Sequence, residues 1–127
     1  MTTLTIEYCS LPEFEKDFKT LEKRFRSLRK DFEILKQYTI ETYHLQNVPT
    51  TAIVPIEFAG YSSQQAYKIR KIACAALRGR GGQSGLRVIY AYAPETKTVT
   101  FIEIYFKGDK ANEDRERLNK FLMKLVR

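Results

Sequence analysis

The sequence has few of the residues on which metal sites and histidine-based catalysis depend. Its 127 residues include one histidine, two cysteines and no tryptophan. Cys9 and Cys74 are far apart and form neither a CxxC motif nor a Cys/His cluster, which argues against a zinc site and predicts no metal and no cofactor. The single histidine, His44, excludes a ribonuclease mechanism that uses a histidine pair, and no Ser/His/Asp arrangement is recognisable.

Long apolar runs are also missing. No stretch approaches the length of a membrane span, and the N-terminus does not show a charged segment followed by an apolar one. We therefore expect a cytoplasmic protein with no membrane partner. In that compartment both cysteines would be reduced, and we expect them to pack as small apolar side chains on strands.

Positive charge and apolar residues are both present in quantity. Lys and Arg number 22 against 15 Asp and Glu, a formal net charge of +7, and 43% of the residues are hydrophobic. This length and apolar content predict one folded domain over residues 1–127. In a domain of this size the charge favours a nucleic acid or an acidic protein as partner. A basic protein with no such partner has the same composition, so charge alone does not decide between them.

The first half of the chain predicts a strand and a helical hairpin. Residues 3–8 alternate and are rich in β-formers, as in a strand. Apolar residues then recur at spacings of three and four, at Leu11, Phe14, Phe18, Leu21, Phe25, Leu28, Phe32 and Leu35. One helix of this length would extend about 40 Å, too long for a small domain. Because Ser10 and Ser27 are suitable N-caps, we expect two helices, 11–25 and 28–42, that bury this apolar stripe.

A connection without regular structure is expected over residues 44–65. It contains prolines and a glycine but also apolar residues that can anchor it to the core. His44 lies at its start, near the end of the second helix, where we expect a surface or capping role.

The second half predicts three strands and a terminal helix. The strands are expected at 66–74, 86–93 and 98–106. A compact turn containing Pro94 joins the last two. Asn112 is a suitable N-cap for a helix at 113–125. The predicted order β, α, α, β, β, β, α indicates an α+β fold: an N-terminal strand and helical hairpin on an antiparallel sheet, with a C-terminal helix. We expect the helices on one face, which leaves the other face for a ligand.

A glycine-rich segment separates the first two of these strands. Residues 79–85 read Gly-Arg-Gly-Gly-Gln-Ser-Gly. They are not a P-loop, because no GK[ST] follows and the next element is a strand and not a helix. We interpret the segment as a hairpin loop that bears Arg78 and Arg80 and whose backbone can still contact phosphates.

Cations and tyrosines recur on the predicted strands. Lys68 and Arg70 are two residues apart and therefore share a strand face. Arg87 interrupts an apolar run, and a charge there needs a carboxylate or an open face for phosphate. Lys107 and Lys110 follow the last strand, so these five could converge if the strands are adjacent. Four strand tyrosines can stack on bases or pack in the core: Tyr67, Tyr90, Tyr92 and Tyr105.

Together these motifs resemble the RelE/ParE toxin superfamily, in particular the RelE and HigB branch of bacterial type II toxin–antitoxin systems. The resemblance covers nearly the whole chain and is weakest over residues 44–65. Three segments carry it: Tyr67-Lys-Ile-Arg70, Ser84-Gly-Leu-Arg87-Val-Ile-Tyr90 and Ile104-Tyr-Phe-Lys107-Gly-Asp-Lys110.

The resemblance implies a small RelE-like fold and a ribosome-dependent mRNA endonuclease that inhibits translation. Its partners would be the ribosome, mRNA and a cognate antitoxin protein, in a toxin–antitoxin hetero-oligomer. In that family strand lysines and arginines surround the scissile phosphate, which the RNA 2′-hydroxyl attacks. The implied catalytic residues are Lys68, Arg70, Arg87, Lys107 and Lys110, and the implied RNA-binding residues are Arg78, Arg80, Tyr67 and Tyr105.

Roles follow from side-chain chemistry. Arginine stays protonated, so Arg70 and Arg87 can clamp a phosphate but cannot accept a proton. We hypothesise Lys68 as the base, since neighbouring cations favour its neutral form. The RelE pattern has an arginine after the last strand and a tyrosine in the final helix, where this chain has Lys107 and Lys110 and no tyrosine beyond Tyr105. The general acid therefore remains open.

Two other functions stay open at this stage. A ParE-type toxin resembles the same fold but poisons DNA gyrase and lacks the nuclease cations. A non-catalytic member of the fold would bind RNA or an antitoxin through the same basic face. Retention of Lys68, Arg70 and Arg87 favours the nuclease.

Overall fold

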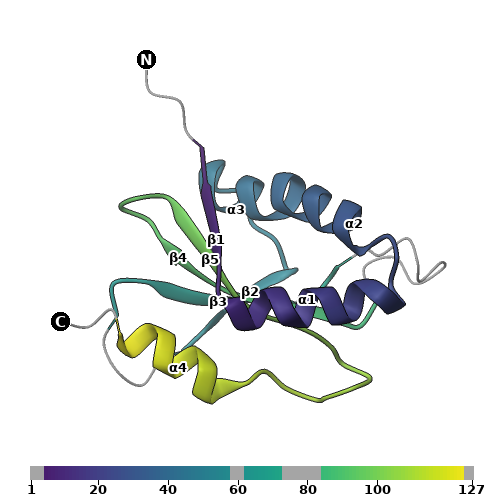
Figure 1. The fold of residues 1–127 in the computed structure, drawn as a ribbon. Helices are drawn as coiled ribbons and strands as arrows, with labels where there is room; N and C mark the ends of the chain where they lie inside the picture. Colours follow the sequence, from purple (N-terminus) through teal and green to yellow (C-terminus); the bar gives the residue numbers. More distant parts are fainter. Residues whose placement is uncertain (1–4, 58–61, 73–83, 125–127) are drawn as a thin grey trace.

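The fold is a five-stranded sheet with helices on both of its faces. The computed structural model describes residues 5–57, 62–72 and 84–124. Its elements, in chain order, are β1 (Glu7–Ser10), α1 (Pro12–Arg24), α2 (Leu28–Leu35), the π-helical turn η1 (Lys36–Ile40), α3 (Glu41–Leu45), β2 (Ile53–Ile56), β3 (Gln65–Ile69), β4 (Leu86–Ala93), β5 (Thr98–Phe106) and α4 (Arg115–Met123). Figure 1 shows this arrangement. The predicted α+β class is confirmed.

The predicted helical hairpin is present. The apolar stripe is broken between α1 and α2 at Ser27, which occupies the N-cap position of α2 as expected, although its hydroxyl donates to the Asp31 carboxylate and makes no capping bond to the backbone. Two details differ from the prediction. The N-cap of α1 is Leu11, while the Ser10 hydroxyl donates instead to the Glu15 carboxylate. The second helical segment also continues beyond its expected end, through η1 and α3 to Leu45.

The sheet has the strand order β1-β5-β4-β3-β2. β3, β4 and β5 form the expected antiparallel meander, but β1 pairs with β5 in parallel, so the sheet is mixed. The expectation of an irregular 44–65 connection was wrong over Ile53–Ile56, which form edge strand β2. Pro55 obscured that strand in the sequence; an edge position tolerates it because one side of an edge strand needs no hydrogen-bond donor.

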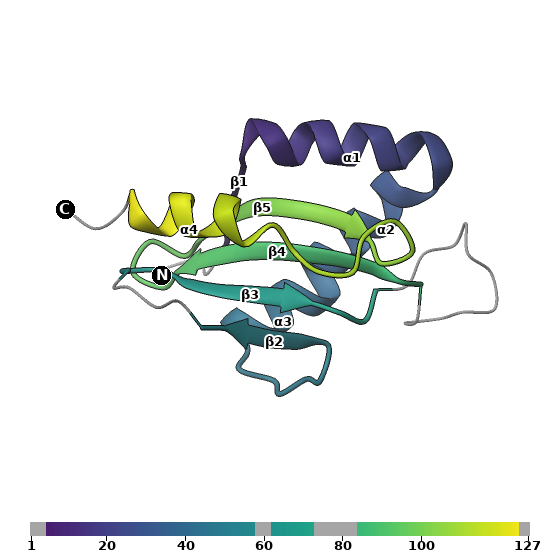
Figure 2. The same ribbon diagram turned by 90° about the horizontal axis from the view of Figure 1, so that it is seen from below.

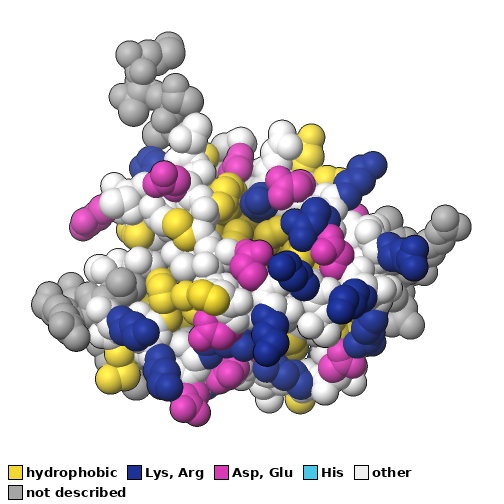
Figure 3. All heavy atoms as spheres, viewed as in Figure 1, with side chains coloured by type: hydrophobic (Ala, Val, Ile, Leu, Met, Phe, Trp, Pro, Cys, Tyr) yellow, Lys and Arg dark blue, Asp and Glu magenta, His cyan; other side chains and the backbone are white. Residues whose placement is uncertain are grey.

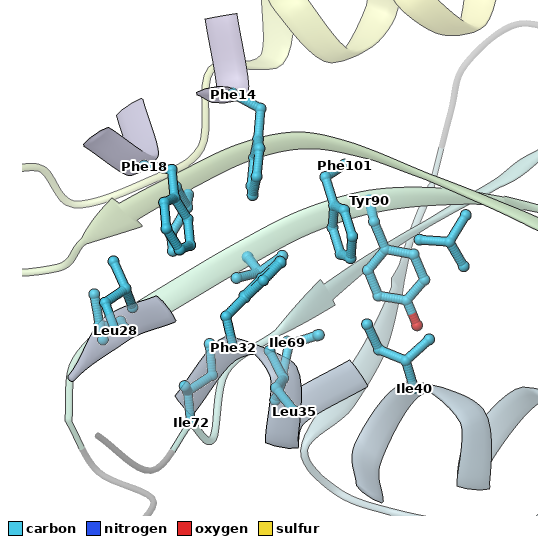
Figure 4. Packing of buried hydrophobic residues seen from close by; sticks show 14 of the residues in the cluster. Phe14, Phe18, Leu28, Phe32, Leu35, Ile40, Ile69, Ile72, Tyr90 and Phe101 are labelled. Carbon is cyan, nitrogen blue, oxygen red and sulfur yellow. The ribbon is translucent and has the colours of Figure 1, made fainter. Parts of the chain in front are cut away.

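The larger core lies between the sheet and the N-terminal helices. Aromatic rings from α1 and α2 meet rings from the strands, and Phe101 lies 5.3 Å from Phe14 and 4.8 Å from Phe32, measured between ring centroids. Figure 4 shows these side chains converging from the helices and the sheet. The hairpin therefore buries its stripe as the sequence predicts.

The opposite face of the sheet carries α4. Leu118 and Leu122 of this helix pack on sheet residues Ile89, Ala91 and Ile102 in a second, smaller core. Figure 2 shows α4 on one side of the sheet and α2 and α3 on the other. The expectation that all helices share one face was wrong. α4 covers one end of the second face and leaves the other end for the loop that precedes it.

Two local expectations also need correction. Asp114 caps α4 in place of Asn112, and its carboxylate accepts from the backbone N–H of Arg117 at 3.0 Å. Cys9 is exposed, because it lies on edge strand β1 and its side chain points away from the core. Cys74, Arg78 and Arg80 lie outside the described residues.

Candidate functional site

Three neighbouring strands place predicted site residues on the face that carries α4. Lys68 of β3 is the register partner of Ile89, and Arg87 of β4 is the partner of Tyr105 in β5. Because side chains alternate along a strand, all of them point to the side of the smaller core. We call Lys68, Arg87, Tyr105 and Lys110 the basic face. The sheet thus brings together residues that are far apart in sequence.

Lys68 is held by a carboxylate from the loop that precedes α4. Its Nζ lies 2.7 Å from Oε1 of Glu113, whose side chain is only 7% exposed. Burial by itself would raise the pKa of Glu113, but contacts with the Lys68 ammonium and the Arg115 guanidinium outweigh burial and keep that pKa below its ordinary value. Glu113 is therefore an anion at neutral pH.

Lys110 is held by a carboxylate of the sheet itself. Its ammonium pairs with Oε2 of Glu103, a residue of β5 that is 2% exposed. The other oxygen, Oε1, accepts from the backbone N–H of Asp114 at 2.7 Å. The Lys110 ammonium also lies 5.4 Å from the centre of the Tyr105 ring. Glu103 therefore ties the middle and the last residue of the loop Lys107–Asp114 to the sheet.

Tyr105 lies between the two lysines. Burial raises the pKa of its hydroxyl, and the nearby Lys68 ammonium opposes that rise. A neutral phenol of this kind donates a hydrogen bond, so Tyr105 is suited to contact a phosphate oxygen or a ribose hydroxyl.

Arg87 differs from the two lysines. Its side chain is half-buried and Nη1 donates to its own neighbour, the Leu86 carbonyl, at 3.1 Å. Over residues 5–57, 62–72 and 84–124, no carboxylate forms an ion pair with it. A guanidinium without a carboxylate in this part of the chain retains donors for an oxyanion, as its position in the sequence indicated.

The remaining predicted residues lie at the margins of the basic face. Arg70 follows β3 and is exposed, and its Nε donates to the Thr51 carbonyl at 3.1 Å. Lys107 follows β5 and is exposed, with its backbone N–H bonded to the Gly85 carbonyl at 2.8 Å. Neither contact places the charged group against Lys68 or Arg87.

Tyr67 faces the other side of the sheet. Its ring stacks on Tyr90 at 5.4 Å and meets Tyr43 and His44 edge to face. The rings of Tyr67, Tyr43 and His44 border an open depression of about 580 Å³ beside the turn between β4 and β5. Tyr67 and Lys68 are adjacent in sequence and therefore point to opposite faces. RNA that contacts both must pass around the sheet.

His44 belongs to the same aromatic cluster, so the expectation of a surface or capping role was wrong. Its Nε2 lies 2.7 Å from the Tyr90 hydroxyl and its ring stacks on Tyr92 with centroids 4.0 Å apart. Burial lowers its pKa to about 4, which keeps the imidazole neutral at pH 7. It sits in this cluster on the larger-core side, opposite the face to which Lys68 and Arg87 point.

Two glutamates of the site were not identified from the sequence. Glu103 had a detectable signal, because it interrupts the apolar run of a central strand in the same way as Arg87. Glu113 had none, since it lies in a polar stretch beside other acidic residues. Only the tertiary structure brings it to Lys68.

Figure 3 shows how charged side chains are distributed on one side of the molecule. Lys and Arg side chains are interleaved with Asp and Glu over the side that carries α1 and α4.

Among the described residues, no group of three His, Cys, Asp or Glu side chains is arranged to hold a metal ion. No helix within the same residues is long and apolar enough to cross a membrane.

Comparison with known proteins supports the fold. No protein-family model matches the chain, and no curated protein sequence matches it. Among solved structures it is similar to a chain of the archaeal RelE–RelB complex from Pyrococcus horikoshii OT3, with a TM-score of 0.51 and 15% identity. The match covers 83% of this chain and 98% of the other. At this level of identity the likeness concerns the fold, and the chain has a RelE-like fold.

Proposed function

We propose that the protein is the toxin of a type II toxin–antitoxin module and acts as a ribosome-dependent mRNA endonuclease. One observation carries the proposal. Three adjacent strands direct Lys68, Arg87 and Tyr105 to the same sheet face, where Arg87 has no carboxylate partner among the described residues. This combination of fixed cations and a neutral phenol matches the needs of a phosphodiester whose charge grows during cleavage.

The reaction would be an in-line transesterification. The ribose 2′-oxygen forms a bond to phosphorus and loses its proton to water, while the bond to the 5′-oxygen breaks and that oxygen gains a proton from water. Arg87 would stabilise the additional negative charge on the phosphate oxygens. Arg70 and Lys107 at the margins, together with Lys110 of the basic face, would bind the flanking phosphates.

The proposed protein partner is a cognate antitoxin. The fold is shared with a chain from a RelE–RelB complex, and the net charge of +7 favours an acidic segment in the partner. Occlusion of the basic face by that segment would keep the toxin inactive and form a hetero-oligomer. Such a module acts in the cytoplasm, where ribosomes and mRNA are.

The test is inducible expression followed by mapping of mRNA 5′ ends. The parent protein is expected to create new 5′ ends within translated messages and arrest growth. Arg87→Ala should reduce cleavage by about 10²–10³-fold, the usual effect of losing one donor to a developing oxyanion. Arg26→Ala is the matched control, since Arg26 is an exposed arginine between α1 and α2. It should cleave as the parent does.

Other outcomes would favour the alternatives. A DNA-damage response without new mRNA 5′ ends would identify a gyrase poison of the ParE type. Binding of an antitoxin or RNA with neither response would identify a non-catalytic member of the fold. Equal cleavage by the parent and Arg87→Ala would show that the basic face does not take part in cleavage.

A further inference from the structure

Two ion pairs of opposite polarity join the sheet to the loop before α4. In one, the sheet provides the anion, Glu103, and the loop provides the cation, Lys110. In the other, the loop provides the anion, Glu113, and the sheet provides the cation, Lys68. In Figure 2 the segment from β5 to α4 runs across the sheet towards the helix, as these contacts require. The loop is thus fastened to the sheet at two points of opposite polarity.

This arrangement changes the electrostatic environment of Lys68. A neutral lysine would be favoured by surrounding cations, but the group nearest to its ammonium is a buried carboxylate at 2.7 Å. A carboxylate at this distance stabilises the protonated amine. Deprotonation of Lys68 would also leave the Glu113 anion without its closest cation in a site that is only 7% exposed.

The ammonium remains accessible to a ligand. The Lys68 side chain is 22% exposed and that of Glu113 is 7% exposed, so Lys68 is the more accessible member of the pair. A lysine ammonium has three donors. With one directed to Glu113 and another close to the Tyr105 hydroxyl, a third is left for a phosphate oxygen.

We infer that Glu113 is a positioning residue that holds the Lys68 ammonium directed at the scissile phosphate. Lys68 then stabilises phosphate charge and does not take the 2′-hydroxyl proton. The inference rests on the proposed endonuclease function, and it replaces the hypothesis, based on the sequence, that Lys68 is the base.

Two variants separate a clamp from a base. Arginine cannot give up its proton at neutral pH, so Lys68→Arg abolishes a base but preserves a cation. We expect Lys68→Arg to cleave within about tenfold of the parent in single-turnover assays on ribosomes, and Lys68→Ala to lose about 10²–10³-fold. An arginine variant as inactive as the alanine variant would overturn the inference.

Glu113→Gln gives the second comparison. The variant should cleave more slowly if Lys68 is a clamp and faster if Lys68 is the base. If Glu113 positions a protonated lysine, its loss should slow cleavage about tenfold, which corresponds to about 1.4 kcal/mol. If Lys68 were the base, the same change would ease its deprotonation and increase cleavage at neutral pH. Glu95→Gln, in the exposed turn between β4 and β5, is the control and should have no effect. An unchanged or faster Glu113→Gln enzyme contradicts the inference.

A measurement that needs no cleavage distinguishes failure of the inference from failure of the proposed function. The Lys68 ammonium can be observed by NMR at pH 7 in the parent and in Glu113→Gln. We expect the parent to show a hydrogen-bonded, slowly exchanging Lys68 ammonium that the variant lacks, because Oε1 of Glu113 lies 2.7 Å from the Lys68 Nζ. Identical ammonium signals in the two proteins overturn the inference. A parent that shows this difference but cleaves no mRNA refutes the endonuclease proposal alone.

Discussion

His44 and Tyr90 form a polar contact inside an otherwise aromatic cluster. The two side chains lie 2.7 Å apart between α3 and β4, and burial holds the imidazole neutral, with its pKa lowered from 6.5 to about 4. A neutral imidazole can pair with the Tyr90 hydroxyl without a counter-ion. This explains how the single histidine serves the fold at neutral pH.

The lowered pKa of His44 makes stability depend on pH. Between pH 6.5 and 4 the unfolded chain binds a proton at His44 that the folded protein does not, so the free energy of unfolding is highest above 6.5 and falls as the pH drops to 4. The loss from this residue should reach roughly 3 kcal/mol. Urea titrations at several pH values should show a weaker pH dependence for His44→Gln. An equal pH dependence of the free energy of unfolding in both proteins would contradict this role of His44.

At the same scale, Arg87 and Glu103 show what a charged residue in a central strand indicates. Each interrupts an apolar run, and burial of an unpaired charge is costly. The two differ in outcome: Glu103 has a lysine and a backbone N–H as partners, whereas Arg87 donates to a carbonyl and is half-buried. The sequence signal marks both positions, but only the packing distinguishes a satisfied charge from one with donors for a ligand.

At the level of elements, α4 depends on the residues that lead into it. The Asp114 carboxylate caps the helix by accepting from the Arg117 N–H, and the Asp114 N–H donates to Glu103 of the sheet. The start of α4 is therefore bonded both to its own first turn and to the sheet. Arg117 adds a bond from the first turn to Asp17 of α1 at 2.7 Å. The entry to α4 and the loop of the basic face are therefore one connected segment.

Loss of the cap should weaken this helix. Asp114→Ala leaves the Arg117 N–H without its acceptor and should lower the free energy of unfolding by about 1 kcal/mol. Chemical denaturation with circular dichroism measures the change. Asn112→Ala is the control, because Asn112 is exposed and is not the cap; it should stay within about 0.5 kcal/mol of the parent. A larger effect from Asn112 than from Asp114 would restore the cap predicted from the sequence.

At the level of the whole molecule, the two faces of the sheet have different tasks. One is covered by α1, α2 and α3 over the larger core, which is dominated by aromatic side chains. The other is covered by α4 at one end and presents the basic face at the other. Stability and the candidate site are thus largely separated by the sheet.

Phe101 is the centre of the larger core. Its ring contacts Tyr8, Phe14, Phe32 and Tyr90. Phe101→Ala should lower the free energy of unfolding by about 3–5 kcal/mol, because lost burial and a residual cavity add together. Urea denaturation measures this. Ile34→Ala on α2, where the side chain is 48% exposed, should change it by about 0.5 kcal/mol or less. Similar losses from the two would refute the assignment of the core.

Much of the fold was predictable because its signals are local. The three- and four-residue spacing from Leu11 to Leu35 predicts amphipathic helices whatever the rest of the chain does. The β4 and β5 strands were predicted within their observed bounds, 86–93 and 98–106, since β-branched and aromatic residues fill them. Strand β2 escaped detection because Pro55 reads as a break unless the edge position is known.

The sequence by itself determined the α+β class, the helical hairpin, the meander and the placement of cations on strands, because each depends on neighbours within a few residues. Only the tertiary structure decided that α4 lies opposite the hairpin, that Tyr67 faces away from Lys68, and that Glu113 of the loop meets Lys68 on the face of the sheet that carries α4. Those outcomes depend on contacts between distant segments. A pattern along the chain does not contain the register and the loop path that create them.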